Sequence, residues 1–131
     1  MQLDAIVDIL RHRVPGCVAI YLFGSHATGG AHRDSDVDLA VLAPAPLGDE
    51  ERWHLAQTLA IALGRDVDLV DLRRASAVMR VQVVDSGKLL FESDATQRQE
   101  FEAVALGGYA RLNEERRGIL EDIRARGTVY G

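Results

Sequence analysis

The stretch GSHATGGAHRDSDVDLAVL, from Gly24 to Leu42, decides the fold of this 131-residue chain. Gly24-Ser25 follows the apolar run CVAIYLF (Cys17 to Phe23), and Asp36-Val37-Asp38 opens a second apolar run that ends near Leu42. Ten residues separate Ser25 from Asp36. Because the first run is short and β-branched, we expect it to be a central strand. The pattern therefore predicts two strands, the first over residues 17–23 and the second over 36–43, joined by a turn and a polar loop.

The residues at the ends of this loop suit a ligand that carries phosphate and metal. Glycine at position 24 lets the backbone approach a bulky anion. Ser25 adds a hydroxyl, and a helix starting there would point free N–H groups at phosphate. Asp36 and Asp38 share one face of a strand, about 7 Å apart, so their carboxylates can converge on hard cations. We therefore expect a nucleotide-binding turn at Gly24 and Ser25 beside a magnesium site at Asp36 and Asp38. Two metal ions at that site, about 3.5–4 Å apart, would hold the attacking and leaving oxygens of a phosphoryl displacement.

This spacing of Gly-Ser and Asp-x-Asp resembles the signature of the polymerase-beta nucleotidyltransferase superfamily. The chain length is similar to that of the minimal nucleotidyltransferases. The segment VDLVDLRRAS (Val67 to Ser76) and the arginine-rich C-terminal segment resemble the MntA-like antitoxins of HEPN/MNT toxin–antitoxin modules. The competing interpretation is a surface loop in which the aspartates are solvated caps and the spacing is coincidental.

A third carboxylate is expected on the strand predicted over residues 66–71 (DVDLVD). Asp68 is the candidate because it stands inside an apolar run, and because the resemblance implies an acidic residue on the strand after the helix that follows Asp-x-Asp. Asp66 shares the face of Asp68 and is the rival, whereas Asp71 falls on the opposite face. A charge that protects an edge strand from aggregation is the structural alternative. In the expected chemistry Asp68 holds the second metal and activates the incoming hydroxyl or accepts its proton.

Periodicity and turn residues predict the remaining elements. The fold class expected is α/β (α+β): a small mixed sheet of three to four strands with helices packed on one face, in a single domain over residues 1–131. The resemblance implies a nucleotidyltransferase core without the extra helical domain of larger members. The other elements expected are a helix over 3–13 ended by Pro15-Gly16, a helix from Asp49 to Gly64 with Asp49 as its cap, a helix over 73–86, a short edge strand over 88–91, and a mostly helical segment over 96–126 interrupted at Gly107-Gly108.

Composition narrows the class of protein. The net charge of −5 argues against a broad nucleic-acid-binding surface, which needs clustered Lys and Arg. The single cysteine, Cys17, allows no internal disulfide and fits a reducing compartment. The N-terminus has no signal-peptide layout, and no apolar run is long enough to cross a bilayer. We therefore expect a cytoplasmic protein without membrane contact.

Several basic residues are weaker candidates for binding. His26, His32 and Arg33 lie inside the motif and could contact phosphate, although solvated loop positions explain the histidines equally well. Arg73-Arg74 could bind a phosphate or a partner, or could simply begin a solvated helix.

The apolar stripe in the C-terminal segment exceeds what a small core requires. A protein partner would cover the remainder; packing on the protein's own sheet is the alternative. The stripe consists of Leu112, Ile119, Leu120 and Ile123.

The function expected by resemblance is that of an antitoxin protein adenylyltransferase. It would transfer AMP from ATP-Mg to a hydroxyl, expected to be that of a tyrosine, of a partner HEPN ribonuclease toxin and release pyrophosphate. The expected absence of acceptor-binding walls also implies that a partner protein supplies the acceptor. The alternatives are a non-catalytic antitoxin that masks its partner by binding, and nucleotidyl transfer to a small molecule or an RNA end.

Overall fold

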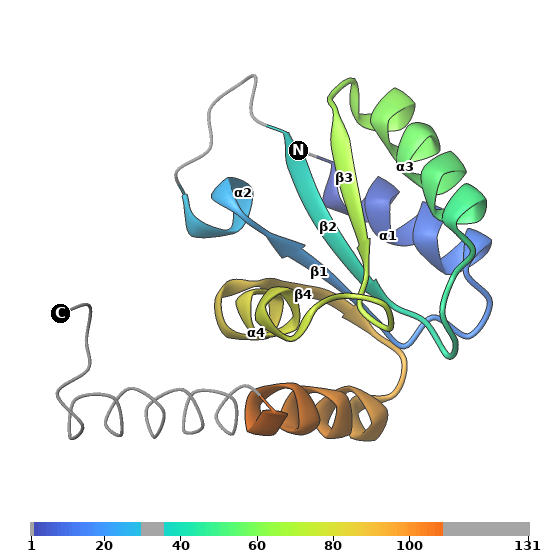
Figure 1. Cartoon of the computed structure of the whole chain (residues 1–131). Coiled ribbons are helices and arrows are strands. Elements are labelled where there is room, and N and C mark those ends of the chain that lie inside the picture. The colour runs from blue at the N-terminus through green and yellow to red at the C-terminus, as the bar shows by residue number, and fades with distance from the viewer. Residues whose placement is uncertain (1, 30–35, 109–131) are drawn as a thin grey trace, which may run out of the picture.

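The computed structural model of the chain describes residues 2–29 and 36–108. Four strands form one mixed sheet in the order β3-β2-β1-β4 (Figure 1). Strand β1 pairs antiparallel with β2 and with β4, whereas β2 and β3 are parallel. The strands are β1 (Ala19–Phe23), β2 (Val37–Leu42), β3 (Val67–Asp71) and β4 (Lys88–Glu92).

The strands alternate with helices along the chain. After β1, the single-turn α2 leads toward β2, α3 crosses over to the parallel strand β3, and α4 returns the chain to β4 at the far edge (Figure 1). A further helix covers residues 95–108 and is called here the 95–108 helix. The labelled helices are α1 (Leu3–Arg13), α2 (Ser25–Thr28), α3 (Asp49–Leu63) and α4 (Ala77–Ser86).

Helix boundaries follow local capping chemistry. The prediction that Asp49 caps α3 is wrong: Gly48 is the cap, and Asp49 begins the acidic first turn, where carboxylates favour the positive end of the helix dipole. Helix α4 begins at Ala77, later than predicted, because the Ser76 hydroxyl accepts a hydrogen bond from the Met79 N–H at 3.1 Å. The residues before Ser76 form the turn that leaves β3.

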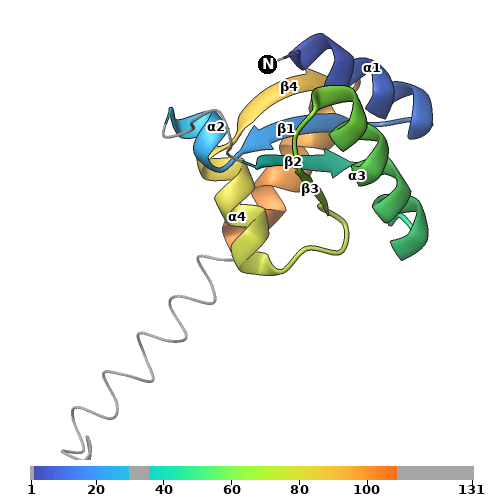
Figure 2. The ribbon, with the colours of Figure 1, turned by 90° about the horizontal axis from the view of Figure 1, so that it is seen from above.

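The sheet is covered on both faces. Alternate residues of β1 and β2, such as Ile20 and Leu39, pack with α1 and α3, whereas Tyr21 and Ala40 belong to a second cluster with Val83 of α4. Figure 2 shows α1 and α3 on one side of the sheet and α4 with the 95–108 helix on the other. The fold class is thus as predicted, but the placement of all helices on one face is wrong. The reason is that β1 and most of β2 are buried on both faces, so both faces need a cover.

The described part of the C-terminal segment is a core element. Asp94 accepts a hydrogen bond from the Gln97 N–H at 3.0 Å and so caps the 95–108 helix. Ala105 is buried, and Phe101 packs against the cluster that contains Val83. Gly107 and Gly108 are both helical, so the interruption expected there is absent from the residues described. The predicted docking stripe that begins at Leu112 lies outside the described residues. No helix within the described ranges could span a membrane.

Candidate active site

Two of the predicted carboxylates lie side by side on neighbouring strands. The parallel register of β2 and β3 places Asp38 directly opposite Asp68. Both residues point to the sheet face that α4 and the 95–108 helix cover, because each has the strand parity of the residues in that cluster. They lie near the N-terminal ends of their strands. The register therefore forms a two-carboxylate site between separate strands.

The electrostatics of Asp38 reflect this crowding. The pKa of Asp38 is raised, chiefly by partial burial and then by the negative charges of Asp68 and Asp36, while His26 opposes the shift. Asp36 itself is exposed and immediately precedes β2. The charges of Asp36 and Asp68 thus both act on Asp38, and a cation placed beside Asp38 would relieve this repulsion.

Gly24 closes the site on the β1 side. Phe23 at the end of β1 is the cross-strand partner of Asp38, so the next residue turns over the carboxylate. Gly24 has φ +69° and ψ −152°, a conformation essentially restricted to glycine. A Cβ at this position would lie 2.2 Å from Asp38 Oδ2. The glycine is therefore required both by its backbone angles and by the space that the carboxylate occupies.

Ser25 begins α2 directly after this glycine, and His26 follows within the same turn. The charge of His26 opposes the rise in the pKa of Asp38. The motif's other basic candidates, His32 and Arg33, lie outside the described residues.

The two other acids of the third strand occupy different positions. Asp66 precedes β3, and its carbonyl accepts a hydrogen bond from Val37 N–H at 2.9 Å, but it does not lie opposite Asp38. Strand β3 is an edge strand, where an exposed acid also discourages further pairing. Asp68 lies opposite Asp38 in the strand register and Asp66 does not, so the register favours Asp68 as the candidate third carboxylate.

Asp71 serves the fold. It is 4% exposed, and its carboxylate accepts hydrogen bonds from Leu47 N–H at 2.8 Å and Arg73 N–H at 3.0 Å. These bonds fix the loop that follows β2 to the end of β3. The sequence placed Asp71 on the face opposite Asp68, but only the structure supplies its role.

The donor set fits a hard divalent cation in its chemistry. Carboxylate oxygens are the ligands that Mg²⁺ accepts, and Asp38 and Asp68 stand opposite each other in the register, with Asp36 two residues from Asp38. Within the described ranges, no three His, Cys, Asp or Glu side chains form a ready-made metal cluster. Such a site would therefore be completed by the ligand, since Mg²⁺ is commonly shared between a few carboxylates and substrate phosphates.

Comparison with known proteins identifies the family. The family model for polymerase beta nucleotidyltransferases matches residues 4–96. The chain is 47% identical over 124 residues to the protein adenylyltransferase MntA of Shewanella oneidensis, with 93% of this chain and 87% of the relative covered. The chain belongs to the polymerase beta nucleotidyltransferase family, in its MntA-like branch. The resemblance inferred from the Gly-Ser and Asp-x-Asp spacing is confirmed.

Solved structures of the same branch match this nucleotidyltransferase over most of its length. A crystal structure of a toxin–antitoxin with AMP-PNP matches with a TM-score of 0.85 and 44% identity, covering 95% of this chain and 99% of that one. A structure of a tri-AMPylated Shewanella oneidensis HEPN toxin in complex with MNT antitoxin matches with a TM-score of 0.78 and 41% identity, with the same coverage.

Proposed function

We propose that this nucleotidyltransferase is an antitoxin that transfers AMP from ATP to a hydroxyl of a HEPN toxin and releases pyrophosphate. The observation that carries the proposal is the opposition of Asp38 and Asp68 under Gly24. Family membership supplies the class of reaction. The relatives supply the donor and the acceptor, since one is a protein adenylyltransferase and one solved structure contains an AMPylated HEPN toxin.

The reaction is an in-line displacement at the α-phosphorus of ATP. The acceptor oxygen forms a new bond to that phosphorus, the bond to the bridging oxygen of the β-phosphate breaks, and pyrophosphate leaves with the electron pair. Asp68, exposed on the edge strand, accepts the proton of the acceptor hydroxyl. Its exposure leaves a protein acceptor free to approach from the open side of β3.

Gly24 and Ser25 are proposed to bind the triphosphate. The absence of a side chain at Gly24 makes room for the Asp38 carboxylate beside the turn, and a glycine in this turn lets the backbone approach the phosphates. The AMP-PNP in a related solved structure supports ATP as the donor. Asp36, Asp38 and Asp68 would hold Mg²⁺, which when bound offsets negative charge on the phosphates and lowers the pKa of the acceptor hydroxyl.

The proposed site of action is the cytoplasm, in which ATP is available. The one thiol, that of Cys17, is buried, and burial raises its pKa to about 11, so it stays protonated and unreactive. A single buried thiol of this kind is compatible with the reducing cytoplasm.

Pyrophosphate release in the presence and absence of purified HEPN toxin tests the reaction. We expect release from ATP and magnesium that depends on the toxin, is lost in Asp38→Asn, and persists in the matched variant Asp66→Asn. A toxin that is bound and inhibited without any pyrophosphate release would contradict the proposal and favour masking.

A further inference from the structure

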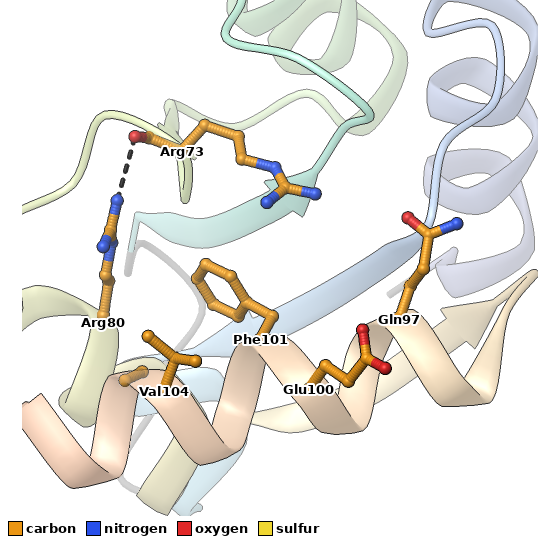
Figure 3. A pocket seen from close by; sticks show the side chains of 7 residues that line it. Arg73, Arg80, Gln97, Glu100, Phe101 and Val104 are labelled. Carbon is orange, nitrogen blue, oxygen red and sulfur yellow. Dashed lines mark hydrogen bonds between the residues drawn. The ribbon is translucent and has the colours of Figure 1, made fainter.

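A pocket outside the carboxylate site lies between the start of α4 and the 95–108 helix (Figure 3). Its volume is about 380 Å³. Phe101 and Met79 of these two elements pack on the sheet face to which Asp38 and Asp68 point. The pocket is lined by Arg73, Arg80, Gln97, Glu100, Phe101, Val104 and Ala105.

Two arginines are held rigidly in this pocket. Arg73 Nε donates to the Ala43 carbonyl at 2.8 Å. Arg80 donates from Nε to the Leu72 carbonyl and from Nη2 to the Arg73 carbonyl, both at 2.9 Å. Figure 3 shows Phe101 between the two guanidinium groups, whose Cζ atoms lie 5.7 Å and 5.6 Å from the ring centroid. The positive charges are thus positioned before any ligand arrives.

Within the described residues, neither guanidinium has a carboxylate partner within 4.0 Å. Two other arginines of the chain do have carboxylate partners. Arg74 pairs with Asp49 at 3.0 Å, and Arg98 pairs with Glu92 and Glu102. Glu100 lines the same pocket and has no ion pair with any described residue, so the described lining carries two cations and one anion. In a chain of net charge −5, this concentration of positive charge favours an anionic ligand.

The pocket also has an exposed apolar side chain in its lining. Val104 is 72% exposed. Arginine and aromatic groups beside exposed apolar surface are typical of protein interfaces, whereas a site for a free small anion has no use for an exposed valine. Arg73 follows Asp68 by five residues, most of them in β3, which separates the two by about 15 Å. A protein bound to the open side of the site can span that distance.

We propose that this pocket binds an aspartate or glutamate side chain of the protein acceptor and positions the acceptor relative to Asp68. The identity of the acceptor rests on the proposed function; the pocket's preference for a carboxylate rests on Arg73, Arg80 and Phe101. The two guanidiniums offer N–H groups to the carboxylate, and the exposed valine contacts the apolar surface around it.

Charge placed at the rim tests the inference without disturbing the arginines. Val104→Glu puts a negative charge at the mouth of the pocket, and Ala103→Glu puts the same charge on the next residue of the helix, outside the pocket lining. Isothermal titration measures the affinity for purified HEPN toxin and for AMP-PNP with magnesium, and initial rates of AMP transfer give the KM for the toxin. Melting temperatures verify that each variant folds.

We expect Val104→Glu to weaken toxin binding and raise the KM for the toxin about fivefold to tenfold, because like charges repel across an interface. Ala103→Glu and Val104→Lys should stay within about twofold of the unchanged protein, while Glu100→Gln, which removes the pocket's own acid, should tighten the complex. AMP-PNP binding should be unchanged in all four variants.

Equal effects of Val104→Glu and Ala103→Glu would overturn the inference, as would equal effects of Val104→Glu and Val104→Lys, which would indicate a purely apolar contact. Loss of AMP-PNP affinity in Val104→Glu would assign the pocket to the nucleotide instead. If the unchanged protein binds toxin but transfers no AMP, the proposed reaction fails, and the binding titrations still decide whether the pocket recognises an acid.

Discussion

Asp38 of β2 lies directly opposite Asp68 of β3, in the parallel strand pair at one edge of the sheet. Asp68 follows Asp38 by thirty positions in the sequence, and the crossover through α3 joins their strands. Burial raises the pKa of Asp38, and the negative charge of Asp68 raises it further. The site thus gathers negative charge, and this has measurable consequences.

The first consequence is a pH-dependent loss of stability in the protein without nucleotide. Because the pKa of Asp38 is raised in the folded state, the folded protein binds this proton more tightly than the unfolded chain does. The stabilising effect of protonated Asp38 is present at low pH and is lost as pH rises from the ordinary Asp pKa through the raised folded pKa. Asp38→Asn stays neutral, so it should reduce the fall in melting temperature over this window and melt a few degrees higher at neutral pH. A variant that melts below the unchanged protein at neutral pH would contradict this.

The second prediction separates the two acids around β3. Asp68→Asn should slow AMP transfer to the HEPN toxin by about a hundredfold to a thousandfold, the range for loss of a proton acceptor, while AMP-PNP binding is largely retained. Asp66→Asn changes the same charge two residues away and should transfer at nearly the normal rate. Single-turnover transfer rates and nucleotide titrations measure the two effects. Equal losses in both variants would move the role away from Asp68.

The double change Asp36→Asn with Asp38→Asn should abolish transfer and leave the fold intact. Asparagine keeps the volume of each side chain but removes the charge that would hold magnesium. Circular dichroism verifies the fold, and transfer to toxin gives the activity. Full activity in this variant would exclude both residues from the reaction.

The strands and their order in the chain could be predicted from the sequence, because short apolar runs bounded by glycine, proline and aspartate usually form β-strands. Asp68 could be placed on the correct strand for the same reason. Its opposition to Asp38 could not, because the register of a parallel pair depends on the packing of α3, which no local pattern encodes. Likewise the helices on the second face follow from burial of both sides of β1, a property of the assembled sheet.

Roles that depend on tertiary hydrogen bonds were also beyond the sequence. Asp71 looks like the other acids of DVDLVD, yet its two bonds to Leu47 N–H and Arg73 N–H make it a structural residue. Arg73 was an equivocal basic residue in sequence, and only the approach of Phe101 from the 95–108 helix reveals its pocket.

Asp71→Ala should destabilise the protein by about 2–3 kcal/mol, because the buried Leu47 N–H and the partly buried Arg73 N–H would lose a charged acceptor. Asp66→Ala removes an exposed acid from the same segment and should change stability by less than about 0.5 kcal/mol. Urea unfolding at neutral pH measures both. A change for Asp71→Ala as small as that of the control would show that water replaces the carboxylate.

Gly24→Ala should impair both folding and nucleotide binding. The strained backbone angle alone costs about 1–3 kcal/mol, and the added methyl would displace the Asp38 carboxylate from which it would lie 2.2 Å. Gly29→Ala is the matched control, since Gly29 also has positive φ but no atom within 4 Å of the added Cβ. Only Gly24→Ala should weaken AMP-PNP binding in the presence of magnesium. Equal nucleotide affinities would show that the carboxylate can shift without loss of function.

Removal of residues 112–131 should weaken the toxin complex more than it lowers stability. The described helix already contributes Phe101 and Ala105 to the core, and this truncation leaves both in place. We therefore expect a melting temperature near that of the full chain, unchanged AMP-PNP binding and poor co-purification with the toxin. A sharply lower melting temperature would instead assign residues 112–131 to the core.

The most direct test of the central claim is the intact mass of purified HEPN toxin after incubation with this protein, ATP and magnesium. We expect toxin that is heavier by one or more AMP groups, with the modification on a hydroxyl side chain, and no mass increase when Asp38→Asn replaces the unchanged protein. Toxin of unaltered mass that is nevertheless neutralised by the unchanged protein would contradict AMP transfer as the antitoxin activity.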